Sequence, residues 1–523
     1  MSLRTYLVLF LSGLILPVIL AQFQPIPGYL DSDYYYAGGV QLAAGKGFTE
    51  PYLWNYLDDP QALPHPSHNY WMPLASIIAA LGMWLTGQTT YAVGRIPFIL
   101  IAACIPPLTA ALAYAFSQRR DLAITSALLA IFSVYHAPFV GVTDNFGLYM
   151  LLGGLYFLVT TYVISSPLLS RNWFFLGLLT GLMTLARTDG LLWLAITFLL
   201  VVLKTKEATP SFAQFTNYAF RNTAFALLGF LLIMSPWYLR NLNVYGSVMA
   251  PGGSRALWLD NYDQTFSYPA SQLTMQSFLS LGWNEIIPDR LWALSNNLQS
   301  GFAAHGGIIL FPFIVVGIIR YWKDVRVRLG TLAWLILFAV MTIVFPFAGA
   351  RGSFFHAGAS LQPLWWTLAP LGLEVVVASA RKRGWFTEQA QFLFRSVLVL
   401  VVILLTAFVV WLRIFSLGWG EGELTYPRID SILVEQGAQK DDVVIVRNSV
   451  GYYIASGRSA VVIPYGGEQT ILAVARQFGA RYLILESKAV LPQLKALYEN
   501  PEGHEHFNYL SEFDGTRIYE IIQ

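Results

Sequence analysis

The sequence predicts a polytopic α-helical membrane protein with a small α/β domain at its C-terminal end. Hydrophobic residues make up 56% of the 523 positions and charged residues only 12%, about half the charged fraction of an ordinary soluble domain. The mean hydropathy is +0.53. Apolar runs recur up to about residue 415, and short β-type runs follow. The formal net charge of +2 gives no reason to expect nucleic acid as a partner.

Eleven apolar runs are candidate membrane-spanning helices. They cover residues 5–21, 96–116, 122–140, 146–164, 173–186, 191–203, 223–238, 306–319, 332–347, 361–379 and 396–414. Ile19 stands where a signal-peptidase site needs a small residue, so we expect an uncleaved first helix rather than a signal peptide. The apolar segment 74–85 is too short to span. We expect it to lie in the outer membrane interface, with a buried helix of an external loop as the alternative.

The distribution of Lys and Arg predicts the orientation of the chain. Basic residues gather in alternate loops, at Arg4, Arg119, Arg120, Arg171, Lys204, Lys206, Arg221, Arg320, Lys323, Arg326, Arg328, Arg381, Lys382, Arg383 and Arg395. Because cytoplasmic loops carry the excess of basic residues, we expect the N-terminus inside and the C-terminus outside. The first long loop, 22–95, is then external.

Two adjacent spans, 173–186 and 191–203, are shorter than the others. Each is about 20 Å long as a helix, less than the bilayer core of roughly 30 Å. Merging them into one helix would reverse the side of every later basic loop, so we expect two short helices that meet at "RTDG". Charged residues at membrane depth are costly, which predicts that Arg187 and Asp189 line a functional cavity. A buried structural ion pair is the alternative.

The change in composition near residue 415 predicts a domain boundary. We expect a membrane domain over 1–417 and an external soluble α/β domain over 418–523. Four runs have β character, "DDVVIVR", "SAVVIP", "RYLILE" and "TRIYEII", and "EQTILAVARQFGA" has a helical period. The domain sequence contains neither a Gly-rich phosphate loop nor metal-ligand spacing.

Ionisable residues mix with aromatic ones on the predicted outer side. They are Asp31, Asp33, His65, His68, Arg95, Asp144, Arg187, Asp189, Arg240, Arg255, Arg351 and His356. Taken singly, several have simpler explanations: a helix N-cap for Asp144, an interfacial anchor for Arg240, and a loop anchor for Arg351 with His356. Together they match the transfer of a group from a phosphate to an acceptor. Carboxylates can act as general bases on the acceptor, whereas arginine and histidine can bind the phosphate. A sugar joined to a polyprenyl phosphate is a substrate of this kind.

Six motifs in order carry a resemblance to a known family. They read "LDSDYYYAGGVQLAAGKGF", "HPSHNYWMPLASIIAALGMWLTG", "GRIPFILIAACIPPLTAALAYAF", "FVGVTDNFGLYMLL", "GLLTGLMTLARTDGLLWL" and "SPWYLRNLNVYGS". With this order and topology, the chain resembles GT-C fold glycosyltransferases of the bacterial branch related to protein O-mannosyltransferases and lipid A aminoarabinose transferases. The resemblance implies a polyprenyl-phosphate-sugar donor and a protein, lipid or glycan acceptor. It also implies an integral protein of the bacterial plasma membrane with its site on the periplasmic side.

The resemblance also implies roles for individual residues. Asp31 matches the first-loop general base, Asp33 is a second base or an orienting group, and Asp144 matches the acidic position that helps to bind acceptor, sugar or metal. Candidates for binding the lipid phosphate are Arg187, Asp189, Arg240, Arg351, His356, His65 and His68. We expect Asp31 and Asp144 in one cavity lined by at least one of these arginines.

The sequence departs from the family pattern at two positions in the first loop. "YWMPL" replaces a Lys-Pro-Pro, and Ser32 follows Asp31 where an acidic pair is usual. His65 and His68 form only a weak metal-binding pair, because no third ligand has helical spacing to them. No cofactor is assigned, and a divalent metal is left open. A transporter or flippase of envelope lipids or glycans, and an envelope assembly protein, are the alternative functions. Against the first, the sequence lacks the internal repeats of many transporters.

Overall fold

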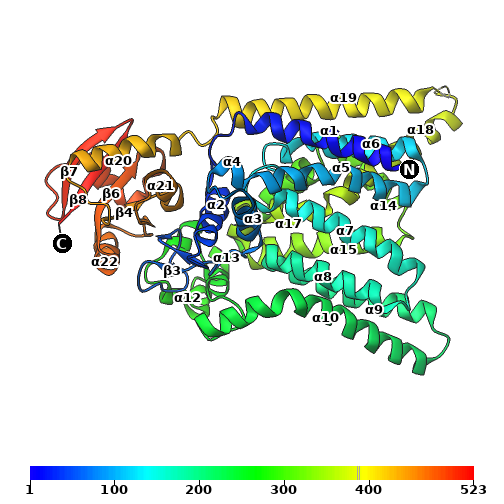
Figure 1. Cartoon of the computed structure of the whole chain (residues 1–523), viewed down its shortest axis with the longest axis horizontal. Coiled ribbons are helices and arrows are strands. Elements are labelled where there is room, and N and C mark those ends of the chain that lie inside the picture. The colour runs from blue at the N-terminus through cyan, green and yellow to red at the C-terminus, as the bar shows by residue number, and fades with distance from the viewer. Residues whose placement is uncertain (386, 388, 523) are drawn as a thin grey trace.

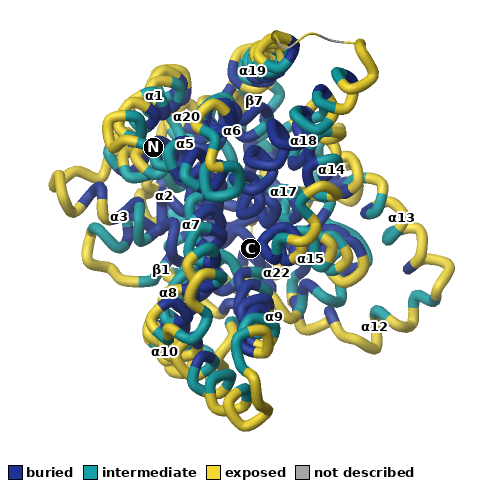
Figure 2. Tube along the Cα trace, turned by 90° about the vertical axis from the view of Figure 1, so that its right-hand side faces the viewer, coloured by how far each residue is buried: buried dark blue, intermediate teal, exposed yellow. Residues whose placement is uncertain are grey.

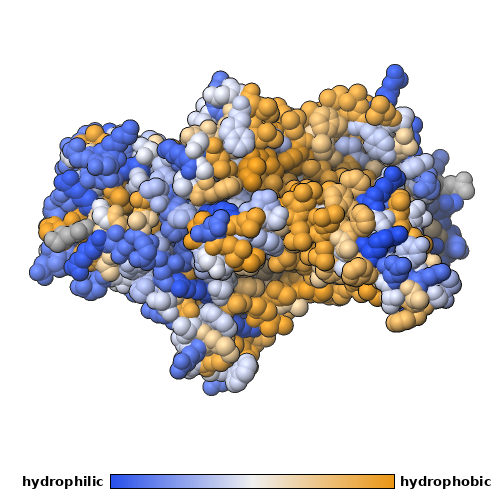
Figure 3. All heavy atoms as spheres, turned by 60° about the horizontal axis from the view of Figure 1, so that its bottom comes forward, coloured by the Kyte–Doolittle hydropathy of each residue, from blue (hydrophilic) through white to orange (hydrophobic). Residues whose placement is uncertain are grey.

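A bundle of long helices and a mixed α/β unit lie at opposite ends of the elongated chain (Figure 1). The computed structural model describes residues 1–385, 387 and 389–522. The N-terminus lies at the far end of the bundle and the C-terminus in the α/β unit. On the face that Figure 3 shows, hydrophobic side chains form a broad band over the bundle, whereas the α/β end is mostly hydrophilic. Because water does not tolerate so broad an apolar surface, the bundle belongs in lipid and the chain is an integral membrane protein.

A helix occupies each of the eleven predicted spans. These helices are α1 (Leu3–Ala21), α5 (Ile96–Ser117), α6 (Arg120–Phe132), α7 (Asn145–Ser165), α8 (Ser170–Ala186), α9 (Leu191–Ala208), α10 (Phe212–Tyr245), α14 (Phe311–Arg320), α15 (Val325–Ala339), α18 (Gln362–Lys382) and α19 (Ala390–Val410). In the part of the chain that the structure describes, eight helical segments are long and apolar enough to cross a membrane. The other three, α6, α8 and α14, have 13, 17 and 10 residues. The number of crossings therefore stays a prediction.

The predicted span over 122–140 is a helix only in its first part. Helix α6 ends at Phe132, after which Ser133 and Val134 have positive φ angles of 33° and 45°. These angles lie outside the right-handed helical region, so the chain leaves the helix axis. A short 3₁₀ turn and a loop then lead to Asp144, the residue before α7.

The predicted break between two short helices is confirmed. Helix α8 ends at Ala186, Arg187 is extended with φ −152° and ψ 140°, and α9 begins at Leu191. Gly190 permits this tight junction, because a Cβ there would lie 2.3 Å from the carbonyl carbon of Met183. The break places the Arg187 and Asp189 side chains inside the protein instead of on the surface of a continuous helix.

The first long loop, residues 22–95, forms a compact unit around an aromatic core. It contains α2 (Leu30–Ala43), β1 (Thr49–Glu50), β2 (Tyr52–Leu53), β3 (His65–Pro66), α3 (Leu74–Thr86) and α4 (Tyr91–Gly94). Tyr34 and Tyr35 are buried, and the rings of Trp54 and Trp71 stack with centroids 4.1 Å apart. Aromatic packing of this kind is worth more than its buried area alone. It holds α2 rigidly above the bundle.

The C-terminal residues form a six-stranded sheet with one strand borrowed from the first loop. Its strands are β4 (Val443–Val446), β5 (Ala460–Val462), β6 (Ala480–Glu486), β7 (Phe507–Phe513) and β8 (Thr516–Ile521), with β2 at the edge. The order is β2-β5-β4-β6-β8-β7, parallel up to β6 and antiparallel beyond it. The sequence predicted β4, β5, β6 and β8 but neither β7 nor the participation of β2. Helices α20 (Tyr426–Glu435), α21 (Ser449–Ser456) and α22 (Glu468–Phe478) accompany the sheet.

A long segment on the same side of the bundle as the first loop connects α10 to α14. It contains the short helices α11 (Gly252–Arg255) and α12 (Met275–Ser280), and the longer α13 (Trp283–Ser300). In the view along the bundle, α12 and α13 extend away from the other helices and are largely exposed (Figure 2). After α15, the short helices α16 (Pro346–Ala348) and α17 (Phe354–Gly358) lead into α18. Helix α17 carries His356 into the site described next.

Candidate functional site

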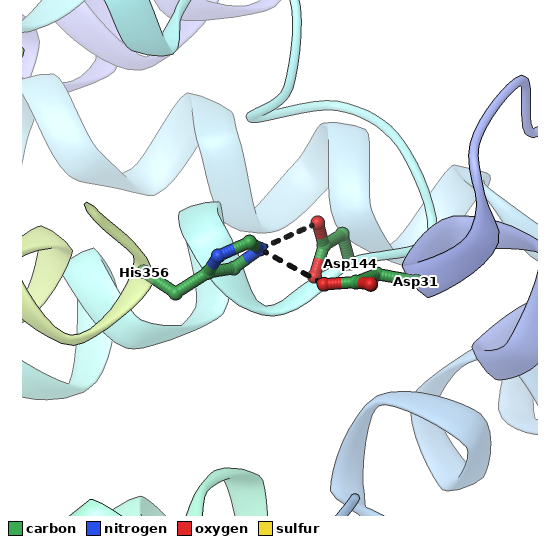
Figure 4. Close-up of side chains that lie close together, drawn as sticks. All are labelled: Asp31, Asp144 and His356. Carbon is green, nitrogen blue, oxygen red and sulfur yellow. Dashed lines mark hydrogen bonds and ion pairs between the residues drawn. The ribbon is translucent and has the colours of Figure 1, made fainter. Parts of the chain in front are cut away.

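Three ionisable side chains from distant parts of the sequence meet at one point (Figure 4). Asp31 lies in the first turn of α2, Asp144 precedes α7, and His356 lies in α17. His356 Nε2 is 3.1 Å from Asp144 Oδ2 and 3.5 Å from Asp31 Oδ2. The three ligand atoms that these residues offer lie within 4.8 Å of one another. Two carboxylates and an imidazole at this distance form a site suited to a proton or a divalent cation.

The two carboxylates of this cluster have different surroundings. Asp144 is fully buried and accepts hydrogen bonds from the Tyr29 hydroxyl and the Asn145 backbone N–H, both at 2.5 Å. Burial opposes its ionisation, but His356 and these two donors together lower the pKa of Asp144. The Asp31 side chain is 29% exposed. Burial raises the pKa of Asp31 to about 6, with a further rise from Asp144 and opposing effects of His356 and Arg187.

His356 is oriented by groups around both ring nitrogens. Its Nδ1 lies 3.0 Å from the Gly352 carbonyl oxygen, which can only accept, so Nδ1 carries a proton. The ring also stacks on Phe146, with centroids 3.8 Å apart and an angle of 21°. Nε2 therefore faces the two carboxylates. A histidine that donates one ring N–H to a carbonyl and presents the other nitrogen to a ligand is the usual arrangement at metal sites.

A cavity of about 670 Å³ lies beside the cluster. Much of its wall is apolar or aromatic, and the wall includes Tyr35, His68, Asn69, Tyr70, Trp71, Met72, Met234, Trp237, Tyr238, Met341 and Phe345. Arg187 and Asp189 also line it. Among the described residues, the wall contains neither Asp31 nor Asp144. Tyr35 links the two places, because it lines the cavity and accepts a hydrogen bond of 2.7 Å from Asn145. The predicted arginine is present, whereas the carboxylates lie next to the cavity.

Arg187 and Asp189 form a buried ion pair at the junction of α8 and α9. The guanidinium donates to Asp189 Oδ2 at 2.7 and 2.9 Å and to the Ser353 carbonyl at 3.2 Å. The Tyr149 hydroxyl donates to the other Asp189 oxygen at 2.7 Å. The paired carboxylate and neighbouring tyrosines favour the charged guanidinium and raise the pKa of Arg187, although burial alone would lower it. The pair thus fixes a charged guanidinium in the cavity wall, with the Asp189 carboxylate as its counter-ion.

Asp33 does not join the cluster. Residues two apart on a helix point about 200° away from each other, so Asp31 and Asp33 face opposite sides of α2. Asp33 is fully buried and its Oδ2 accepts a hydrogen bond of 2.9 Å from Asn448, which also donates to Glu423 at 3.1 Å. Burial raises the pKa of Asp33 to about 7 and that of Glu423 well above its usual range. Asp33 therefore holds the C-terminal unit against α2.

Both histidines of the first loop contact other side chains of that loop. His65 Nε2 lies 3.1 Å from Asp58 Oδ2, and its Nδ1 lies 3.7 Å from Glu50 Oε1. Although burial opposes it, these two carboxylates raise the pKa of His65 to about 9. His68 lines the cavity, but its ring nitrogens hydrogen-bond Ser67 and Ser76 at 2.8 and 3.0 Å. The two histidines do not converge on a shared ligand, and neither belongs to the carboxylate cluster.

The two remaining arginines also lie outside the cluster. Arg240 donates to the Ser67 carbonyl at 2.7 Å, and its guanidinium carbon lies 4.7 Å from the centroid of the Trp237 ring. This geometry agrees with the alternative that Arg240 is an anchor, and the segment that it contacts is the first loop. Arg351 is exposed and lies 4.7 Å from the centroid of the Tyr262 ring.

Several residues of the site were missed by the sequence analysis. Tyr29, which donates a hydrogen bond to Asp144, lies two positions before Asp31 and directly before the motif that begins at Leu30. Tyr149 lies one helical turn after Asn145 on α7 and reaches Asp189. Both are tyrosines near the acidic residues that were found. The sequence around Asn448 and Glu423 does not indicate that they contact Asp33, because Asp33 is about 400 residues away in sequence.

No protein-family model and no curated protein matches the chain. Solved structures do match. The Archaeoglobus fulgidus oligosaccharyltransferase tethered to an acceptor peptide has a TM-score of 0.51 and 14% identity, over 100% of this chain and 74% of that chain. The same protein in complex with Zn and sulfate has a TM-score of 0.50 and 12% identity, over 98% and 73%. ArnT from Cupriavidus metallidurans bound to undecaprenyl phosphate has a TM-score of 0.50 and 11% identity, over 99% and 98%.

Both of these proteins are GT-C fold glycosyltransferases. The likeness extends over nearly the whole of this chain and confirms the predicted GT-C fold. Because the sequence identities are only 11 to 14%, this structural likeness is evidence for the fold alone. The reaction has to be argued from the residues of the site.

Proposed function

We propose that the chain is a membrane glycosyltransferase that moves a sugar from a polyprenyl-phosphate donor to an acceptor on the outer face of the bacterial plasma membrane. One observation carries the proposal: a cluster of two carboxylates and a histidine lies beside an apolar cavity whose wall holds a buried arginine. A lipid-linked sugar phosphate needs an apolar cavity for its tail, a cation for its phosphate and a base for the acceptor. Residues 418–523 are proposed as the external domain that covers this site.

Asp31 is the proposed general base. Of the two clustered carboxylates it is the more exposed, so an acceptor can reach it. Its pKa of about 6 leaves it mostly ionised at neutral pH while keeping it a stronger base than an ordinary aspartate. Asp144 is buried and contacts Tyr29, the Asn145 backbone N–H and His356, so its proposed role is to orient His356.

Arg187 is the proposed ligand of the donor phosphate. It is already held by Asp189, so binding a phosphate requires little ordering of the side chain. Its position in the wall of a cavity rich in aromatic and methionine side chains joins a positive charge to an apolar surface. The solved ArnT structure contains undecaprenyl phosphate, a molecule of this chemical class.

Asp31, Asp144 and His356 also fit a divalent cation. Two carboxylates and an imidazole are an ordinary ligand set, and the Nδ1–H of His356 is fixed by the Gly352 carbonyl. When bound, such an ion would supply positive charge for the departing phosphate. Each carboxylate has two oxygens, so Asp31 can take part in both roles. The related oligosaccharyltransferase has been solved in complex with Zn and sulfate.

The proposed reaction is a single displacement. The acceptor oxygen or nitrogen forms a bond to the anomeric carbon while the bond from that carbon to the phosphate oxygen breaks, and Asp31 takes the acceptor proton. The lipid phosphate leaves with the bonding electron pair and is stabilised by Arg187, in a site where low dielectric strengthens that interaction. Attack from the face opposite the phosphate inverts the configuration. A protein, lipid or glycan can supply the acceptor; the oligosaccharyltransferase structure holds an acceptor peptide.

The test uses the full chain in proteoliposomes that contain polyprenyl-phosphate sugars, with a peptide, a lipid or a glycan supplied as the acceptor. Mass spectrometry of material that co-purifies with the protein identifies the sugar to be used. Glycosyl transfer predicts loss of the lipid-linked sugar together with equimolar release of polyprenyl phosphate. A flippase would instead move the intact lipid-linked sugar between leaflets without release, and that result would overturn the proposal.

A further inference from the structure

Helix α13 has three distinct faces. At 100° per residue, Ile286, Ala293 and Asn297 lie on one buried face, and Asn297 donates to the Met341 carbonyl at 3.2 Å. An exposed apolar stripe lies beside this face, within an arc of about 100° that continues past the helix end. The stripe consists of Trp283, Ile287, Leu291, Leu298 and Phe302, which are 71%, 51%, 58%, 52% and 46% exposed.

Polar residues occupy most of the rest of the helix. The remaining arc carries Asn284, Glu285, Asp289, Ser295 and Gln299. It also contains Trp292, which is 41% exposed and has its ring centroid 6.1 Å from that of Phe347. A helix with one face on protein, one apolar face open and one polar face matches an element that lies in a membrane interface beside its own protein. Trp283, the most exposed residue of the stripe, is of a type enriched at membrane interfaces.

The stripe continues into the lipid-facing surface of the bundle. After α13 the chain passes Ile309, which is 41% exposed, and enters α14. There Phe311, Val315 and Ile319 form an exposed row with spacing of four residues. Helix α12 precedes the stripe with Met275 and Leu279, which are 57% and 52% exposed. The apolar surface is thus continuous from the external segment to a predicted membrane span.

The position of α12 and α13 agrees with this continuity. Figure 1 places both at the end of the bundle that carries α2 and β3, between the apolar bundle and the α/β unit. Figure 2 shows that they extend sideways from the bundle. We propose that α12 and α13 form an interfacial membrane anchor, with the stripe of Trp283, Ile287 and Leu291 resting on the lipid surface on the side of the site.

The anchor would act on the cavity through the chain that precedes it. Pro251, Gly253 and Ser254 line the cavity and lie in the same external segment as α12. An anchor in the bilayer surface would therefore hold one wall of the cavity at the level of the lipid headgroups. This inference concerns a binding surface for lipid and does not depend on the proposed chemistry.

The test measures which medium surrounds the stripe in the full chain. Cys104 is the single cysteine, so a Cys104→Ser background accepts one label at a chosen position. Ile287→Cys reports the stripe, and Glu285→Cys, two residues away, is the matched control on the polar face. Each variant carries an NBD fluorophore in phosphatidylcholine nanodiscs with or without doxyl-labelled lipid, and iodide serves as the aqueous quencher. Leu291→Cys, one turn along the stripe, gives the same measurement if Ile287→Cys does not fold.

We expect doxyl lipid to quench the label at position 287 about threefold more than the label at position 285, and iodide to show the reverse order. Equal access of iodide to both positions, without lipid quenching, would show that the stripe faces water and would overturn the proposal. Protection of position 287 from both quenchers would also overturn it, because the stripe would then be covered by protein, such as a second copy of the chain.

Discussion

Asparagine substitutions at Asp31 and Asp33 provide a matched test of the site. Both residues lie in α2 and both changes remove one negative charge with almost no change in shape. The two side chains point in different directions: Asp31 faces His356, whereas Asp33 faces Asn448. We expect Asp31→Asn to abolish most of the glycosyl transfer and Asp33→Asn to leave the rate within about twofold, since the amide oxygen of the substituted side chain would still accept the hydrogen bond from Asn448.

The expected loss follows from the role of a general base. Such a group contributes about 10²- to 10⁴-fold to a rate, or about 3–5 kcal/mol of the barrier. Because the pKa of Asp31 is about 6, the wild-type rate should fall as the pH drops through about 6, when the base becomes protonated. The rate that persists in Asp31→Asn should lack this acidic limb.

Asp33→Asn should affect stability instead of rate. Burial raises the pKa of Asp33 from 3.8 to about 7, so the folded state favours the protonated form. Protonated Asp33 therefore contributes stability that is fully present below pH 3.8 and is lost as the pH rises through about 7. The neutral asparagine avoids this loss, so at pH 8 it should raise the unfolding free energy on the order of 1 kcal/mol. At pH 4 the two proteins should be alike.

The assay measures the initial rate of polyprenyl phosphate release in proteoliposomes with matched amounts of each variant, across pH 5 to 8. Thermal unfolding in the same buffers gives the stabilities. The reasoning is refuted if Asp31→Asn keeps full activity, or if Asp33→Asn loses as much activity as Asp31→Asn while remaining folded.

Three further predictions address the other parts of the site. Arg187→Ala should lower kcat/KM for the lipid donor by about 100-fold and weaken binding of polyprenyl phosphate, measured by titration; unchanged binding would remove Arg187 from the phosphate site. His356→Ala should lower the affinity for Mn²⁺ or Zn²⁺ by at least about tenfold, measured by calorimetry against the wild-type protein, and equal affinities would argue against a metal there. Asn448→Ala should increase hydrogen exchange in α21 while α8 stays unchanged, because it leaves the carboxyl groups of Asp33 and Glu423 without their shared donor; unaltered exchange in α21 would show that this contact does not hold the C-terminal unit.

Local sequence patterns predicted the helices and most strands well. Apolar runs mark the helices because lipid selects for side chains that need no hydrogen-bond partner. The break at Arg187 was predictable, since merging the two short apolar runs into one helix would have reversed the side of every later basic loop. The strands β4, β5, β6 and β8 are buried apolar runs, whereas β7 alternates with polar residues and is partly exposed, which hid it.

The partners of the acidic residues were only partly predictable. Asp31, Asp144 and His356 each stood out as ionisable residues on the outer side, but their meeting depends on the packing of α2, α7 and α17. The choice between Asp31 and Asp33 depended on the helical conformation of residues 30–43, because their spacing of two then turns them to opposite faces. The edge strand β2 joins a sheet whose other strands begin almost 400 residues later, and no local pattern marks such a pairing.

By itself the sequence determined that this is a membrane protein and where its helices lie, and it predicted that acids, bases and aromatic residues collect on one side. These properties follow from local composition, since each segment must match the medium around it. Only the tertiary structure decided which of those residues meet. Asp31 joins His356 and Asp144, whereas Asp33, His65 and Arg240 hold the first loop and the C-terminal unit in place. Contacts between ionisable groups depend on distances of a few ångströms across separate elements, and packing sets those distances.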